Sequence, residues 1–229
     1  QLMGLGRVEP NNEHEPFCMT VVGLKISRRA NAVSSLHGHV SRRMWSTLWP
    51  DRAEEDIPIG HITNGVHVLS WLAQQMWTLY DRHFPVKWVM RMGDADVWQA
   101  IHNIDPGELW ETHNALKNQL VAFVRRRLSR QARRREESEE VVESARQLLD
   151  PNILTIGFGR RFATYKRANL LLSDVERLIS LVSNTARPVQ VIFAGKAHPR
   201  DEPGKQLIQR IANCRLDAKF HNRIVFVED

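Results

Sequence analysis

The last third of the sequence alternates short apolar runs with helical patterns, and this alternation restricts the possible folds more than any other feature. Apolar runs occupy residues 153–156, 189–194 and 224–227, as in buried strands. Between them, residues 169–182 and 204–212 carry apolar side chains three or four positions apart, which predicts helices. Strands that alternate with helices form parallel sheets, so we expect an α/β fold containing the first half of a doubly wound sheet.

The first 150 residues are predicted to be mainly helical. Helical spacing of apolar residues covers residues 19–44, 69–80, 95–102 and 108–149. Residues 59–68 instead predict a brief strand followed by a turn at Asn64-Gly65. The change of pattern near Pro151 divides the chain into a helical part, 1–150, and a sheet-forming part, 151–229.

The sequence is basic, with 32 lysines and arginines against 26 aspartates and glutamates. This balance suits an anionic partner, and nucleic acid, phosphate esters and free phosphate all fit it. Seven arginines fall within residues 125–135 and are followed by a run of glutamates. They indicate either a nucleic-acid patch or a solvated helix in which Arg133 pairs with Glu137 and Arg135 with Glu139. No aromatic platform accompanies the arginines, so the solvated helix is favoured and no nucleic-acid partner is expected.

Cysteines, histidines and hydropathy limit the remaining classes of function. Cys18 and Cys214 lie far apart and form neither a metal-ligand spacing nor a disulfide framework, which is typical of a reducing cytoplasm. The histidines lack the helical spacing of metal ligands, so no metal site is expected. The apolar runs are too short to span a membrane and no secretory leader is recognisable. We therefore expect a cytoplasmic protein without membrane attachment.

Four cations follow the first predicted strand: Arg160, Arg161, Lys166 and Arg167. Ligands of open parallel sheets bind at the carboxyl ends of the strands. Crowded cations repel one another unless an anion lies among them, and the side chains of arginine and lysine both suit phosphate. The loop therefore predicts a phosphate site, and the alternative is a basic loop that only keeps the edge of the sheet soluble. Its glycine spacing matches neither the dinucleotide fingerprint nor the P-loop.

Four segments of the chain resemble segments of the α-glucan phosphorylases, in the same order and spacing. Residues 161–167, Arg-Phe-Ala-Thr-Tyr-Lys-Arg, are similar to the segment that opens the C-terminal domain of glycogen and maltodextrin phosphorylases, especially those of the short bacterial and archaeal branch. Residues 31–38, 63–67 and 193–197 resemble the family's Asn-Gly-Val-Ser, Thr-Asn-Gly-Val and Gly-Gly-Lys-Ala segments. The resemblance covers nearly the whole chain and implies an internal fragment of a longer enzyme.

The resemblance also implies a fold and an activity. The fold would be of the GT-B type, with two Rossmann-like domains facing across a cleft. Residues 1–150 would be the end of the N-terminal domain with connecting helices, and residues 151–229 the truncated start of the C-terminal domain. The activity of the family is phosphorolysis of terminal α-1,4-glucosidic bonds, which releases α-glucose 1-phosphate and uses pyridoxal 5'-phosphate. The implied partners are an α-1,4-glucan and inorganic phosphate, and the full-length glycosyltransferase would be a homo-oligomer.

Motif positions assign roles to five residues through this resemblance. Arg161 and Lys166 would bind the substrate phosphate as the catalytic cations, and Arg160 and Lys166 would lie near the cofactor phosphate. Tyr165 and Asn64 would each bind a hydroxyl of the transferred glucose. The family's Gly-x-Gly-Asn-x-Lys segment, whose lysine forms the Schiff base, does not occur in this sequence. The isolated chain is therefore expected to bind the cofactor poorly and to be inactive.

Two other functions share some of these features. A GT-B glycosyltransferase that uses a sugar nucleotide, such as a glycogen synthase, also holds phosphates with an arginine and a lysine at a strand end. The Tyr-Lys-Arg-Ala segment and the Thr-Asn-Gly-Val turn fit that class poorly. The remaining interpretation is a non-catalytic remnant that binds glucan or nucleic acid.

Overall fold

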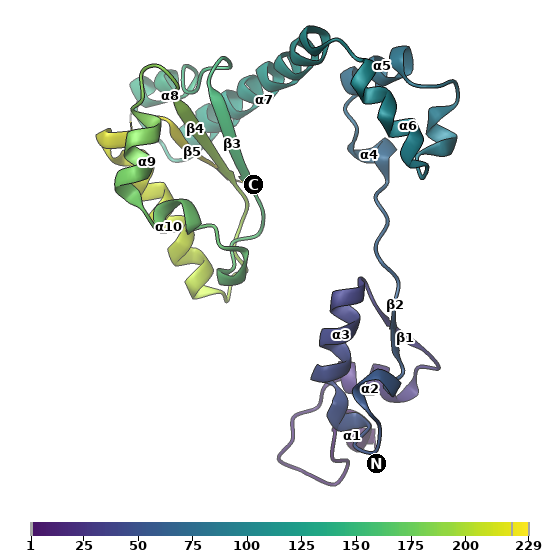
Figure 1. Ribbon diagram of the computed structural model, residues 1–229. Helices are drawn as coiled ribbons and strands as arrows, with labels where there is room; N and C mark the ends of the chain where they lie inside the picture. The colour runs from purple at the N-terminus through teal and green to yellow at the C-terminus, as the bar shows by residue number, and fades with distance from the viewer. Residues whose placement is uncertain (1, 221, 229) are drawn as a thin grey trace. The chain divides into compact units, whose positions relative to one another are not determined.

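The computed structural model describes residues 2–220 and 222–228, and the chain divides into two compact units, Gln1–Leu72 and Ala73–Asp229 (Figure 1). The first unit is built on a small parallel pair of strands. β1 (Ala30–Ala32) pairs with β2 (Ile59–His61), and α3 (Ser35–Met44) lies between them in sequence and contacts both. Its other elements are α1 (Leu2–Leu5), α2 (Met19–Ile26), α4 (Val68–Trp71) and the 3-10 turns η1 (Ser46–Leu48) and η2 (Glu54–Asp56).

The helical spacing over residues 19–44 predicts one helical face, and this prediction is wrong. α2 ends at Ile26, and the chain then becomes extended and forms β1. α3 begins afresh after Ser34, whose side chain caps it by accepting a backbone hydrogen bond. Pairing of β1 with β2 buries Ala32. Because β2 lies far along the chain from β1, the spacing of apolar residues within 19–44 cannot reveal this strand.

The second unit starts with short helices that surround an aromatic cluster. The α-helices of the unit are α5 (Gln74–His83), α6 (Ala95–Gln99), α7 (Pro106–Arg134), α8 (Glu139–Ala145), α9 (Val175–Val182) and α10 (Glu202–Leu216). The 3-10 turns are η3 (Trp88–Arg91), η4 (Ala100–Asn103), η5 (Thr164–Lys166), η6 (Leu170–Leu172) and η7 (Ala218–Phe220). The rings of Tyr80, Phe84, Trp88 and Trp98 all contact one another, with centroids 4.6 to 6.3 Å apart. This cluster joins α5 to the turns that follow it.

The long basic segment forms a helix pair, one of the two arrangements predicted for residues 108–149. α7 ends at Arg134, and α8 begins after Ser138, which caps it. Among the ion pairs of the described residues, the predicted pairs of Arg133 with Glu137 and of Arg135 with Glu139 do not occur. Arg133 instead lies 3.7 Å from Glu139, and Arg135 lies 3.7 Å from Glu137. The pairing differs because the chain reverses between the helices, where residue 136 has a positive φ, and so the glutamates do not continue the face of α7.

The predicted parallel sheet is confirmed, and the chain is an α/β protein. β3 (Leu154–Gly159), β4 (Val189–Ala194) and β5 (Ile224–Val227) pair in parallel in the order β3-β4-β5. α9 and α10 cover one face, where the buried residues include Phe162, Leu178, Val191, Phe193, Ile211 and Phe226. α7 and α8 cover the other, where Val121, Val124 and Leu128 pack with Ile192, Val225 and Val227 (Figure 1). Helices on both faces account for the apolar character of β4 and β5.

β3 is less buried than its apolar sequence predicts. It lies at the edge of the sheet, and within the described residues it pairs with β4 alone. Leu154 is 64% exposed, and the strand borders an apolar cavity of about 710 Å³ that α7 lines with Trp110, Leu116 and Leu120. In the part of the chain that the structure describes, no helix is both long and apolar enough to cross a membrane, and no cluster of three potential metal ligands occurs.

Candidate functional site

A cavity of about 440 Å³ opens at the carboxyl ends of all three strands of the sheet. We call it the strand-end cavity, and its lining residues are Phe123, Arg127, Gly159, Arg160, Arg161, Ala194, Gly195, Lys196, Val227 and Glu228. Gly159, Ala194 and Val227 are the last residues of β3, β4 and β5. The lining contains four cations and one carboxylate. Its position is where parallel sheets bind ligands, and its charge suits an anion.

One buried ring holds the cationic loop against the sheet. Phe162 directly follows the two arginines, is fully buried, and has its ring 5.5 Å from the rings of both Phe158 and Phe226. Its backbone N–H donates to the Lys196 carbonyl at 2.9 Å, which joins the loop after β3 to the loop after β4. Arg160 and Arg161 are exposed, but the backbone that carries them is therefore fixed.

A glycine makes the approach of these two loops possible. Gly195 has φ +143°, and a Cβ added there would collide with the carbonyl oxygen of Arg160. A side chain at this position would be strained by both the backbone conformation and the contact. The glycine of the Gly-Lys-Ala segment thus has a structural role directly beside the arginines.

The carboxylate of the strand-end cavity is occupied by other arginines. Arg134 Nη2 lies 3.5 Å from Glu228 Oε2, and Arg135 also pairs with this carboxylate. Arg127, from α7, donates to the Glu228 backbone carbonyl at 3.0 Å. Within the described residues, the side chains of Arg160 and Arg161 have neither a hydrogen-bond nor an ion-pair partner. An anion in the cavity would therefore be the counter-charge for these two arginines.

Lys166 and Tyr165 lie beyond this lining, in the turn η5. The Lys166 ammonium is 4.6 Å from the centroid of the Tyr165 ring, a cation–π contact, and Tyr165 is 67% exposed. Arg167, the fourth cation of the predicted loop, has φ +57° and ends the turn. The structure thus brings Arg160 and Arg161 together in one cavity, but it turns Lys166 towards Tyr165 rather than towards that cavity.

Asn64 lies in the first unit, in the extended stretch after β2. Its side chain is exposed, and its backbone N–H donates to the Val33 carbonyl at 3.0 Å. This bond connects two of the segments that carry the family resemblance, residues 31–38 and 63–67. The turn predicted at Asn64-Gly65 is not formed, because backbone bonds from Ile62 and Asn64 to the Ala32 and Val33 carbonyls keep this stretch extended beside β1. The four other candidate site residues belong to the second unit.

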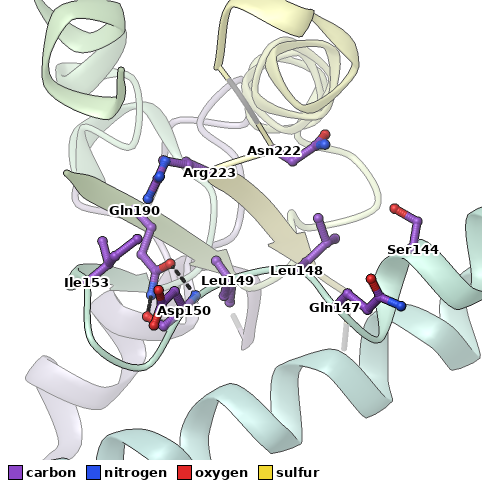
Figure 2. Close-up of a pocket in the computed structure, with 9 residues that line it drawn as sticks. All are labelled: Ser144, Gln147, Leu148, Leu149, Asp150, Ile153, Gln190, Asn222 and Arg223. Atoms are coloured by element: carbon purple, nitrogen blue, oxygen red, sulfur yellow. Dashed lines mark hydrogen bonds between the residues drawn. The ribbon is translucent and has the colours of Figure 1, made fainter. Parts of the chain in front are cut away.

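The opposite end of the sheet holds a different cavity of about 350 Å³ (Figure 2). One buried amide of its lining, Gln190, makes all of its hydrogen bonds within the protein. The Gln190 side chain accepts from the Asp150 N–H at 2.9 Å, and it donates to the Asp150 carbonyl and to Thr155 Oγ1, both at 2.8 Å. Figure 2 shows the two bonds to Asp150, which hold the loop before β3. Gln190 therefore has a structural role, and the strand-end cavity, with four cations in its lining, is the better candidate site for an anion.

Sequence reasoning missed two cations of the strand-end cavity. Lys196 lies two residues after the end of β4, so the rule applied to the end of the first strand would have found it at the end of the second. Arg127 carries no such signal, because it comes from α7 and reaches the strand ends only through the packing of that helix on the sheet.

Comparisons with known proteins agree with the resemblance in sequence. No protein-family model matches the chain. The chain is 39% identical over 220 residues to a glycogen phosphorylase of Aquifex aeolicus, which covers 96% of this chain and 31% of the relative. It is 38% identical over 229 residues to a maltodextrin phosphorylase of Thermococcus litoralis, and the match covers 100% of this chain and 26% of the relative. A glycogen phosphorylase of Mycobacterium bovis is 41% identical over 211 residues, and this match covers 92% of this chain and 24% of the relative. The chain spans about a quarter to a third of the length of these curated relatives, and it belongs to the glycogen and maltodextrin phosphorylase family.

Proposed function

We propose that this chain provides the phosphate-binding part of an α-glucan phosphorylase. The whole enzyme would cleave terminal α-1,4-glucosidic bonds with inorganic phosphate and release α-glucose 1-phosphate. The observation that carries the proposal is the strand-end cavity, where Arg160 and Arg161 have no partner within the described residues. Relatives named glycogen phosphorylase and maltodextrin phosphorylase supply the reaction class.

The arginines would act by positioning and by electrostatic stabilisation. The fork of Arg161 can donate two parallel hydrogen bonds to a phosphate, which fixes the orientation of the anion as well as its place. Arg127 and Lys196 add positive charge from α7 and from the end of β4. Fixed cations need no rearrangement when charge develops on the reacting phosphate, which is how such groups accelerate a reaction. Lys166 would leave the Tyr165 ring to reach the anion.

The sugar would be held by Tyr165 and Asn64. The exposed Tyr165 hydroxyl can both donate to and accept from a sugar hydroxyl, and the Asn64 amide has the same double capacity. The reaction would take place in a GT-B arrangement with residues 1–150 in the N-terminal domain and 151–229 in the C-terminal domain. A cytoplasmic location and a homo-oligomeric full-length enzyme complete the proposal.

Pyridoxal 5'-phosphate is the proposed cofactor, and the residues present suit its phosphate end. A second phosphate beside the substrate needs its own cations, and Arg160 and Lys166 are two that no described carboxylate neutralises. When bound, the cofactor supplies a phosphate group next to the substrate phosphate. No lysine of this chain lies in the family's attachment segment, so the chain by itself is proposed to bind the cofactor weakly and to lack activity.

Binding of inorganic phosphate to the chain tests the central claim. Arg161→Gln should weaken binding by at least about tenfold, since one charge-assisted hydrogen bond is worth about 1.5–3 kcal/mol. Arg187→Gln is the matched control, because Arg187 is also exposed but precedes β4 at the other end of the sheet. Isothermal titration calorimetry measures both. Equal affinities in the two variants would contradict the assignment of the site.

Turnover in the full-length enzyme that contains this chain tests the reaction. Phosphorolysis of a maltodextrin should require phosphate, and Lys166→Ala should lower kcat/KM for phosphate strongly. Near-normal phosphorolysis by Lys166→Ala would show that Lys166 is not required for the reaction. Glucosyl transfer from a sugar nucleotide, without phosphate dependence, would instead favour a glycogen synthase-like enzyme.

A further inference from the structure

The α7–α8 pair carries a second cationic cavity, separate from the strand-end cavity. We call it the arginine hollow. It has a volume of about 420 Å³ and is lined by Ala122, Arg125, Arg126, Ser129, Arg130, Arg133 and Arg146. Its lining shares no residue with the strand-end cavity and contains neither an acidic nor an aromatic side chain. Five of its seven lining residues are arginines.

Helix geometry explains why these arginines meet. Arg126, Arg130 and Arg133 are spaced four and three residues apart, so they lie on one face of α7. Seven residues of α-helix rise about 10 Å, so these three guanidinium groups form a short row. α8 packs beside this part of α7, and Arg146, just after α8, completes the lining from the second helix.

The charges of the hollow are only partly neutralised. Arg125 donates from Nε to the Leu148 carbonyl and from Nη2 to the Leu149 carbonyl, both at 2.7 Å, so it is held by dipoles and keeps its full charge. This fixed cation lies at one side of the row.

Two of the five arginines form ion pairs with carboxylates. Arg146 lies 2.7 Å from Glu143, and Arg133 lies 3.7 Å from Glu139. Arg126 and Arg130 are exposed and, within the described residues, have no hydrogen-bond or ion-pair partner. The centre of the row is therefore a site of uncompensated positive charge.

We propose that the arginine hollow binds a compact polyanion with two or three linked phosphoryl groups. The length of the row, about 10 Å, matches such a ligand and is short for a nucleic-acid track. Planar guanidinium groups favour phosphoryl oxygens, which they can bind in pairs. The lining has no ring on which a base could stack, and the glutamates of α8 interrupt the positive surface.

Calorimetric titration of the full chain with sodium tripolyphosphate tests this proposal. The test variant is Arg126→Gln/Arg130→Gln, which removes the two partnerless cations. The control variant is Arg28→Gln/Arg29→Gln, which removes two adjacent, exposed arginines of the first unit and the same total charge. All titrations are made in an Arg160→Gln/Arg161→Gln background, which removes the two arginines of the strand-end cavity that have no described partner and so weakens binding there.

Tripolyphosphate should bind with one-to-one stoichiometry, and the affinity should fall at least about tenfold in Arg126→Gln/Arg130→Gln while staying within about twofold in the control. Increasing salt should weaken the binding. Absence of binding, or an equal loss in both variants, would overturn the proposal, because the second result indicates net charge alone. Tighter binding of a short single-stranded oligonucleotide, lost in the same variant, would replace the small polyanion with nucleic acid and so overturn the ligand class. Failure here leaves the strand-end cavity unaffected, since the two sites share no lining residue.

Discussion

At the scale of single residues, two uncharged residues determine where the cations of the strand-end cavity lie. Phe162 anchors the loop that carries Arg160 and Arg161, and Gly195 lets the next strand-end loop pass beside the Arg160 carbonyl. The arginines gain no described partner of their own. Their position is therefore set by the backbone, and changes at Phe162 or Gly195, neither of which carries a charge, should alter anion binding.

Gly195→Ala should lower the free energy of unfolding by about 1–3 kcal/mol, the usual cost of a strained backbone position. The added methyl group collides with the Arg160 carbonyl, so phosphate affinity should fall as well. Gly157→Ala is the control, because a Cβ there meets no atom within 4 Å. Urea unfolding and calorimetry measure the two effects. If Gly195→Ala and Gly157→Ala had the same free energy of unfolding and the same phosphate affinity, the close approach of the loops would contribute to neither quantity.

Some residues of the candidate site were predictable from the sequence and others were not. Arg160 and Arg161 were predictable, because they follow an apolar run that ends in glycines and the ligand end of a parallel strand is known. Arg127 was not, because its contribution depends on how α7 crosses the sheet. The orientation of Lys166 towards the Tyr165 ring is likewise a matter of local packing that residue order does not encode.

At the scale of elements, α7 illustrates both the strength and the limit of periodicity. The pattern correctly predicts a helix with an apolar stripe, and Val124 and Leu128 of that stripe are buried. Leu120 and Phe123, which share the spacing, are 46% and 48% exposed, whereas Val121 is buried against the sheet. Spacing identifies a face, but the partner that covers the face decides which of its residues lose contact with water.

Leu128→Ala and Leu120→Ala make the same chemical change at a buried and an exposed position of α7. Leu128→Ala should lower the free energy of unfolding by about 2–5 kcal/mol, because it removes buried methyl groups and leaves a cavity. Leu120→Ala should cost well under half as much, about 1 kcal/mol or less. Urea denaturation followed by circular dichroism compares them. Equal destabilisation would mean that the stripe is buried as a whole and that the packing of α7 differs from the one described.

Helix ends should also separate the two cysteines in reactivity. The backbone N–H groups of Val21 and Thr20, at the start of α2, lower the pKa of the Cys18 thiol, whereas burial raises the pKa of the Cys214 thiol within α10. The thiolate is the reactive form, so alkylation of Cys18 should accelerate at a lower pH than alkylation of Cys214. Peptide mass spectrometry after iodoacetamide treatment at several pH values measures both rates. In urea the rates should converge; a faster Cys214 in the folded protein would contradict the assigned environments.

At the scale of the whole molecule, the chain contains two compact units with different contents. The sheet, both of its hydrophobic clusters and every residue of the strand-end cavity fall within residues 73–229, and Asn64 falls within the first unit. Of the proposed site residues, Asn64 alone would thus come from the first unit, whereas Tyr165 and the cations proposed to bind phosphate would come from the second. The alternation of strands and helices made the three-stranded sheet of the second unit predictable, whereas the small strand pair of the first unit rests on contacts between distant residues.

Residues 73–229 expressed alone should fold and bind inorganic phosphate with the affinity of the whole chain, to within about a factor of two, because each unit of this kind has its own core. Circular dichroism and calorimetry on the shortened and full chains provide the comparison. An unfolded product, or a large loss of affinity with the fold retained, would show that the first unit contributes directly to the second.

Within the described residues, one edge of β3 is unpaired, and this has a consequence for the chain in concentrated solution. Unpaired backbone groups along a strand edge are a template for pairing with another molecule, and Leu154 adds apolar surface beside them. Natural sheets commonly protect such edges with lysine or proline, and β3 has neither. Crowding should therefore promote self-association through this strand, with light scattering rising at concentrations where a variant bearing Ile156→Lys remains monodisperse.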